Sequence, residues 1–147
     1  MTDIDTLAYF DGLASEMNAS PERFDPLGDI ELDLAVVMER AGRDPFAVLL
    51  GFRGIGCESV AEIDPAAAEA ADCYLLGDLD AWTAMFDNIV AEGGATGRWT
   101  LNSLSMVGDV IGVHGDDPMR VDRFFRFNQT LQEFFDGAAR VWSPAAA

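Results

Sequence analysis

Residues 30–63 have the sequence IELDLAVVMERAGRDPFAVLLGFRGIGCESVAEI, which contains three strand-like runs separated by short turns. Apolar residues occupy every second position of residues 30–39, which is the pattern of a half-buried strand. After a turn cluster that contains Gly and Pro, residues 46–53 form a second and more apolar run, and residues 57–63 predict a third strand. Because the connections are short, we expect the three strands to form an antiparallel meander.

Helices and a further strand are predicted on both sides of this meander. Residues 6–17 carry apolar side chains at helical spacing, and residues 66–71 form an Ala-rich turn. Residues 73–76 predict a short apolar strand. A helix over residues 78–92 follows, with Asp in its first turn, as the helix dipole favours, and a Gly-Gly pair after its end.

The last third of the chain predicts two more strands and a long helix. Residues 98–106 alternate in polarity and predict a strand, and residues 110–114 predict another after a turn at residues 108–109. An Asp-Pro pair then opens a helix over residues 117–140, because Asp caps helices and Pro favours their first position. The tail at residues 143–147 is expected to fray.

These elements predict an α+β fold with a single, mostly antiparallel sheet of five to six strands and helices packed on one face. Strands and helices do not alternate as repeated βαβ units, which argues against a doubly wound parallel sheet. The 147 residues contain no internal repeat and no linker. We therefore expect one domain over residues 1–147, ordered over roughly residues 6–140.

The charge of the chain is strongly negative, with 26 acidic residues against nine basic ones and a net charge of −17. All nine basic residues are Arg. This balance argues against nucleic acid as a partner and against docking on anionic membranes, since both need clustered cations. It also excludes a catalytic Lys. The acidity is compatible either with a salt-rich cytoplasm or with a GC-rich genome, which disfavours Lys codons.

The sequence also predicts where the protein is located. Its first five residues include two acidic residues, Asp3 and Asp5, and no basic one, whereas a secretory signal begins with a basic region. No apolar run approaches the roughly 20 residues of a membrane span. Cys57 and Cys73 form no disulfide framework or CxxC pair, so we expect reduced thiols in or near the core. We expect a soluble cytoplasmic protein without stable membrane insertion.

Few residues suggest chemistry. His114, the only histidine, precedes Asp116 and Asp117, so it is either a general base or a plain strand-end residue. One His cannot build a multi-His metal site, and the glycines between residues 51 and 56 precede no helix that would bind a phosphate. The sequence therefore predicts no catalytic residue, no metal ligand and no cofactor.

The helices carry more apolar surface than one small sheet face requires. Half of the ten Phe residues lie between residues 124 and 135. These faces are either plain core or the lining of a cavity for a lipid, since ligand pockets are mostly apolar with a few polar groups. Asn128 lies within the apolar face of the last helix. It either anchors a ligand in such a pocket or bonds to backbone where the helix meets the sheet.

Two further stretches carry a family resemblance. Residues 71–82, ADCYLLGDLDAW, combine a strand that ends in Gly-Asp with a helix that has an early Trp, and residues 117–136 form a Phe-rich closing helix. With the meander, they make the chain resemble the sterol carrier protein type 2 family of lipid-binding domains over roughly residues 10–139. The chain departs from many members in having no Lys, and residues 93–106 replace the family's amphipathic helix and Gly-rich strand.

The resemblance implies a five- or six-stranded sheet with a hydrophobic tunnel between the sheet and the helices. The tunnel would hold a sterol, a fatty acid, a fatty acyl-CoA or a similar lipid. The lining residues that the resemblance implies are Trp82, Met85, Phe86, Leu101, Leu104, Met106, Phe124, Phe125, Leu131 and Phe135.

Three functional hypotheses follow. The first is non-enzymatic binding or carriage of a hydrophobic small molecule, driven by apolar burial. The second is an accessory subunit or homodimer whose apolar helix faces dock on a partner enzyme or a second copy, with Arg120, Arg123 and Arg126 beside them. The third is a small enzyme that uses His114 with Asp116 or Asp117.

Overall fold

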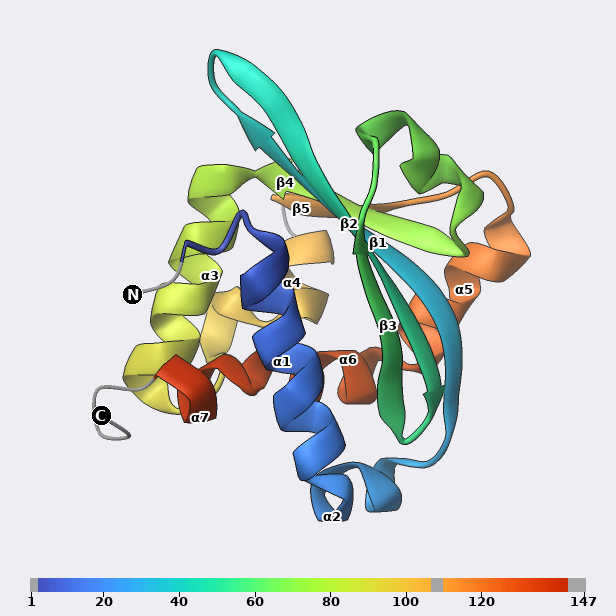
Figure 1. The fold of residues 1–147 in the computed structure, drawn as a ribbon, viewed down its shortest axis with the longest axis vertical. Coiled ribbons are helices and arrows are strands. Elements are labelled where there is room, and N and C mark those ends of the chain that lie inside the picture. Colours follow the sequence, from blue (N-terminus) through green and yellow to red (C-terminus); the bar gives the residue numbers. More distant parts are fainter. Residues whose placement is uncertain (1–2, 107–109, 143–147) are drawn as a thin grey trace.

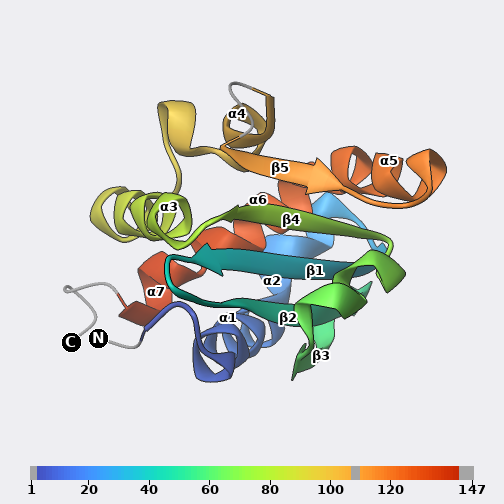
Figure 2. The same ribbon diagram turned by 90° about the horizontal axis from the view of Figure 1, so that it is seen from above.

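The computed structural model describes residues 3–106 and 110–142 and contains one five-stranded sheet in the order β3-β2-β1-β4-β5. Figure 2 shows the strands in this order. The strands are β1 (Ile30–Arg40), β2 (Arg43–Gly54), β3 (Gly56–Glu62), β4 (Cys73–Asp78) and β5 (Ile111–His114). The expected turn at residues 108–109 and the expected frayed tail at residues 143–147 lie outside the described residues.

The pairing of the strands confirms the predicted fold class. β1, β2 and β3 form the expected antiparallel meander, with Val36 of β1 opposite Val48 of β2. β4 lies on the other side of β1 and runs parallel to it, with Leu75 opposite Val36. β5 pairs antiparallel with β4. Three of the four pairings are therefore antiparallel, and the fold is α+β with a mixed sheet.

Helices join and cover the strands (Figure 1). The α-helices are α1 (Leu7–Ala19), α2 (Pro21–Phe24), α3 (Leu79–Glu92), α4 (Leu101–Met106), α5 (Pro118–Arg126), α6 (Asn128–Asp136) and α7 (Ala138–Trp142). Short 3-10 helices are η1 (Asp25–Leu27), η2 (Pro65–Ala70) and η3 (Gly97–Trp99). Within the described residues, no helix combines the length and apolarity that crossing a membrane requires.

The core lies between one face of the sheet and the longer helices. Leu34 and Val36 of β1 pack there with Phe10 of α1, Trp82 of α3 and Phe135 of α6, all of them fully buried. The alternate residues of β1 point to the opposite face, where Ala35 and Val37 form a smaller cluster with Ala68 of η2. The Ala-rich turn predicted at residues 66–71 is therefore a 3-10 helix that covers part of the second face.

The predicted strand at residues 98–106 is wrong. The structure has η3 and α4 there, and Thr100 joins the two elements. Its carbonyl oxygen accepts the Leu104 N–H at 2.9 Å and its hydroxyl accepts the Ser103 N–H at 3.2 Å, which starts a helical turn. Leu101 and Leu104 are three residues apart, so one helix face buries both, whereas a strand would place them on opposite faces.

The single helix predicted over residues 117–140 is also wrong, since the chain forms α5, α6 and α7 instead. Its start is as predicted, because the Asp117 carboxylate accepts the Met119 N–H at 2.9 Å. The helical direction changes at Phe127 (φ −102°, ψ 17°) and again near Gly137. α5 packs against β4 and β5, whereas α6 packs against α1 and α3. The helices lie along different axes, so the chain bends between them (Figure 1).

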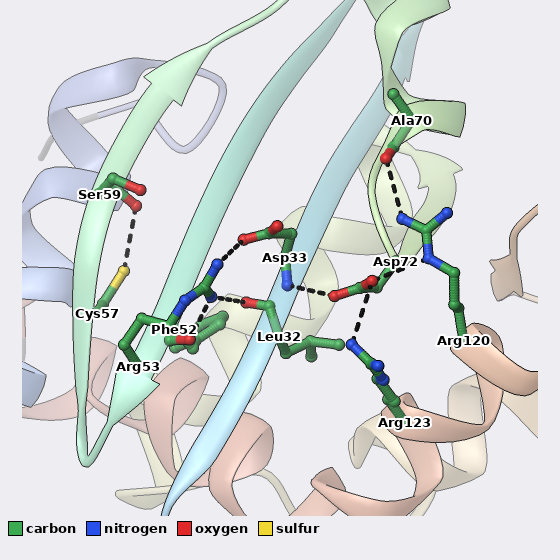
Figure 3. Close-up of polar contacts among 10 residues, drawn as sticks. All are labelled: Leu32, Asp33, Phe52, Arg53, Cys57, Ser59, Ala70, Asp72, Arg120 and Arg123. Carbon is green, nitrogen blue, oxygen red and sulfur yellow. Dashed lines mark hydrogen bonds and ion pairs between the residues drawn. The ribbon is translucent and has the colours of Figure 1, made fainter.

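Asp72 holds α5 on the sheet (Figure 3). Its carboxylate, in a residue only 8% exposed, accepts the Asp33 N–H of β1 at 2.8 Å and Arg120 Nε at 3.0 Å. Arg123 Nη1 lies 3.4 Å from the same carboxylate. Arg120 also donates to the carbonyl oxygen of Ala70 at 3.1 Å. Two cations of one helix therefore share one carboxylate of the strand junction.

These partners determine the charge state of Asp72. Burial alone would raise the pKa of its carboxyl, but the Asp33 N–H, Arg120 and Arg123 outweigh burial and hold the pKa below its ordinary value. A carboxyl whose pKa is lowered on folding stabilises the fold at pH values above its unfolded pKa of about 3.9. That stabilisation is lost as the pH falls through the folded pKa.

We expect Asp72→Asn to lower the free energy of unfolding at neutral pH by about 2 kcal/mol, since it removes hydrogen bonds to a charged group. Urea unfolding measures this loss. The matched control is Asp122→Asn on α5, because Asp122 is exposed and its one ion pair within the described residues is with Arg126 at 3.8 Å. The difference between wild type and Asp72→Asn should shrink below about pH 4. An equal effect of the two substitutions would contradict the role of Asp72.

Candidate ligand-binding site

Eight of the ten lining residues implied by the resemblance are at most 3% exposed and belong to one apolar core. They come from α3, α4, α5 and α6, which bring together segments up to 53 residues apart in the sequence. The eight residues are Trp82, Met85, Phe86, Leu101, Leu104, Phe124, Leu131 and Phe135.

Three aromatic rings form the centre of this group. The ring centroids of Trp82, Phe86 and Phe135 lie 5.9 to 6.5 Å apart in every pairing. Trp82 Nε1 donates to the carbonyl oxygen of Val37 at 3.2 Å, so the polar edge of the indole is satisfied within the sheet. These rings contact one another directly, as side chains of a closed core do.

Met106 and Phe125 lie apart from this group. Met106 is 68% exposed at the end of α4, and Phe125 is 49% exposed on α5. Phe125 instead lines a pocket of about 490 Å³ together with Tyr74 and His114. Tyr74 packs with the second face of the sheet, and its ring stacks on His114 with centroids 5.4 Å apart.

Asn128 places a polar group on the apolar side of α6. It precedes Leu131 and Phe135 by three and seven residues, which puts it on their helix face. Its Nδ2 atom is buried and has no hydrogen-bond partner among the residues that the structure describes. Such an atom costs roughly 1–3 kcal/mol unless an acceptor reaches it. A water molecule or a ligand oxygen would relieve that cost.

A pocket of about 420 Å³ lies beside η3 and α4, within the range of roughly 300–1,000 Å³ typical of ligand sites. Its lining residues are Arg98, Trp99, Ser103, Leu104 and Val110. Leu104 is shared with the buried group, and Trp99 packs against the same core. The pocket therefore borders directly on the apolar interior.

Sequence reasoning missed most of this pocket because it assigned residues 98–106 to a strand. A strand places Trp99 and Leu104 on opposite faces, whereas η3 and α4 turn both toward one pocket. The signal that would have found the pocket is the pair Leu101 and Leu104 at helical spacing, behind a Thr that caps a helix.

Polar contacts from α6 hold the pocket wall in place. Gln132 Oε1 accepts the Leu101 N–H at the start of α4 at 2.8 Å, and Gln132 Nε2 donates to Asp136 Oδ1 at 2.9 Å. The same Asp136 oxygen accepts the Ala95 N–H at 3.0 Å. Burial raises the pKa of the Asp136 carboxyl, against the opposing effect of these hydrogen bonds. One pair of α6 side chains thus attaches both α4 and the loop before η3.

The two cysteine thiols lie in the structural core. Cys57 and Cys73 are both buried, as predicted for core thiols. Burial raises the pKa of Cys57 to about 11 and that of Cys73 to about 12, so both thiols stay protonated at neutral pH. Over residues 3–106 and 110–142, no three His, Cys, Asp or Glu side chains gather closely enough to hold a metal ion.

We expect Gln132→Ala to loosen α4, since it removes the acceptor of the Leu101 N–H and a donor to Asp136. Native-state hydrogen exchange should show faster exchange at the amides of Leu101 and Leu104. The control is Gln129→Ala, which alters an exposed residue of the same helix. Unchanged exchange at both amides in Gln132→Ala would contradict the proposed attachment.

The sequence matches no protein-family model and no curated protein sequence. The structure is nevertheless similar to the crystal structure of sterol carrier protein 2, with a TM-score of 0.72, 17% identity and coverage of 94% of this chain and 98% of that one. It is also similar to the solution structure of a conserved hypothetical protein, possibly a sterol carrier protein, from Thermus thermophilus. There the TM-score is 0.73, the identity is 19%, and 97% of this chain and 92% of the other are covered.

Both likenesses extend over nearly the whole of each chain, so they concern the complete architecture rather than a shared motif. At these identities they show a common fold. The fold that the sequence resemblance implied is thus confirmed, and the chain has the fold of sterol carrier protein 2.

Proposed function

We propose that this protein binds a hydrophobic small molecule without covalent chemistry and carries it. The observation on which this proposal rests is the pocket of about 420 Å³ beside α4, which borders the apolar core. Of the lining residues that the structure describes, Trp99, Leu104 and Val110 are apolar. The shared fold supports the proposal, because one of the two similar structures is called a sterol carrier protein and the other possibly one.

The binding energy would come from apolar burial, at about 25 cal/mol for each Å² of ligand and pocket surface removed from water. The eight buried residues already pack on one another. A ligand larger than the pocket must therefore displace part of the helical layer that covers them. The six-residue α4 is a short part of that layer, and the Leu101 N–H at its start is held by Gln132 of α6. We infer that α4 shifts when a long ligand enters, and that Asn128 then gains an acceptor.

The proposal requires no reaction on the ligand. His114, the residue of the enzymatic hypothesis, stacks on Tyr74, which packs on the second face of the sheet. Among the residues that the structure describes, the lining of the pocket beside α4 contains neither His nor Cys. In this proposal the ligand is bound and released unchanged. The docking hypothesis stays a prediction, which the mass of the purified protein in solution tests.

We expect Ser103→Trp to abolish binding of a neutral hydrophobic dye such as Nile red, because the indole fills the pocket from its wall. The affinity should fall at least tenfold, or about 1.4 kcal/mol, in a fluorescence titration. The matched control is Ser105→Trp, which adds the same ring to α4 at a residue outside the pocket lining. Circular dichroism checks that both variants fold.

Two results would contradict the proposal. Either wild-type protein fails to bind the dye, or both Trp variants bind it as tightly as the wild type does. A second measurement, native mass spectrometry of detergent-free protein, should show the mass of one chain with an added lipid-sized mass. A mass of two chains without added small molecule would favour the docking hypothesis instead.

A further inference from the structure

Arg98 differs from the other arginines in its partners. Eight of the nine arginines have a carboxylate oxygen within 4.0 Å, and the eight are Arg23, Arg40, Arg43, Arg53, Arg120, Arg123, Arg126 and Arg140. Arg98 has no such partner in the part of the chain that the structure describes. Acidic residues outnumber basic ones 26 to nine, so an unpaired cation is unexpected at a random surface position.

The position of Arg98 is fixed by its neighbours. Its guanidinium lies over the Trp99 ring, 4.6 Å from the centroid, in a cation–π contact. The loop before it is held by Asn88 of α3, whose Oδ1 accepts the Thr96 N–H at 2.9 Å and whose Nδ2 donates to Thr96 Oγ1 at 3.1 Å. Stacking covers one face of the guanidinium and leaves its N–H edges able to donate.

Arg98 also lines the pocket of the proposed function. There it shares the lining with Ser103, which supplies a hydroxyl, while the three other lining residues are apolar. Arg98 is exposed and Leu104 is buried, so the lining changes from a charged mouth to an apolar interior. This arrangement matches a molecule with a charged head and an apolar tail.

We infer that the ligand is an amphiphile with an anionic head, and that Arg98 selects it by pairing with that head. This inference rests on the proposed function of the same pocket. The fork of guanidinium N–H groups fits the two oxygens of a carboxylate. A single negative charge is favoured over a double one, because the chain already carries a net charge of −17. The head is therefore a carboxylate, and the tail lies between Trp99 and Leu104.

The test compares two molecules with the same tail, dodecanoate and dodecan-1-ol, below their micellar concentrations, each displacing Nile red from the full chain. The wild type should prefer dodecanoate by about fivefold to tenfold, and the preference should weaken in high salt. Arg98→Gln should lower the affinity for dodecanoate more than the affinity for dodecan-1-ol, so that the ratio of the two affinities falls to about one. Because the alcohol carries no charge, the comparison of the two affinities separates recognition of the anionic head from a general loss of the pocket.

The matched control is Arg126→Gln. Arg126 also lies over a neighbouring ring, that of Phe127 at 6.0 Å, but it pairs with Asp122 on the surface of α5. This variant has the same change in net charge and should keep the preference for dodecanoate. Equal affinity of the wild type for both molecules, or a preference that survives in Arg98→Gln, would overturn the inference and leave the proposed function standing. Failure of both molecules to bind wild type would overturn both.

Discussion

Strand β1 is the constraint on which the other elements depend, because it lies at the centre of the sheet and has a neighbour on each side. Its larger side chains, such as Leu34 and Met38, face the helices and need a broad apolar cover from α1, α3 and α6. Ala35 and Val37 face the other way, and their small size lets the Ala-rich η2 lie close to the sheet. The main structural role of the apolar helix faces is therefore to cover β1. The pocket forms at the edge of that cover and is lined by residues of η3 and α4. Of these two elements, α4 lies beside β5 (Figure 2).

Elements that depend on local pattern could be predicted from the sequence. Alternation identified β1, and helical spacing with a following Gly pair identified α3, which ends at Gly93 in a left-handed conformation (φ 82°). The Asp-Pro start of α5 was equally local, since Asp117 caps the helix with its own carboxylate. For the candidate site, the sequence identified which helices carry buried aromatic residues. In each of these cases the interactions that decide the structure lie within a few residues of one another.

The parts of the fold and of the candidate site that the sequence did not predict depend on contacts between distant segments. Residues 98–106 have a pattern that suits a strand as well as a short helix, and the Leu101 N–H finds its acceptor in Gln132, 31 residues away. The turn at Phe127 follows from α5 and α6 packing on different elements, with α5 held by Asp72. That Arg98 has no carboxylate partner among residues 3–106 and 110–142 depends on where the acidic side chains of those residues come to lie. Charge in this chain therefore has a structural effect, since ion pairs such as Asp72 with Arg120 hold helices in place. For Arg98 we propose a second effect, the binding of an anionic ligand head.

The most direct test of ligand binding beside α4 is an NMR titration of the isotope-labelled full chain with dodecanoate. We predict that the largest shift changes occur at the indole N–H of Trp99 and the amides of Leu104 and Val110, which line one pocket. The amides of Tyr74 and His114, which line the separate pocket of about 490 Å³, should change little. Changes centred on Tyr74 and His114, or no change at any of these groups, would contradict binding at the α4 pocket.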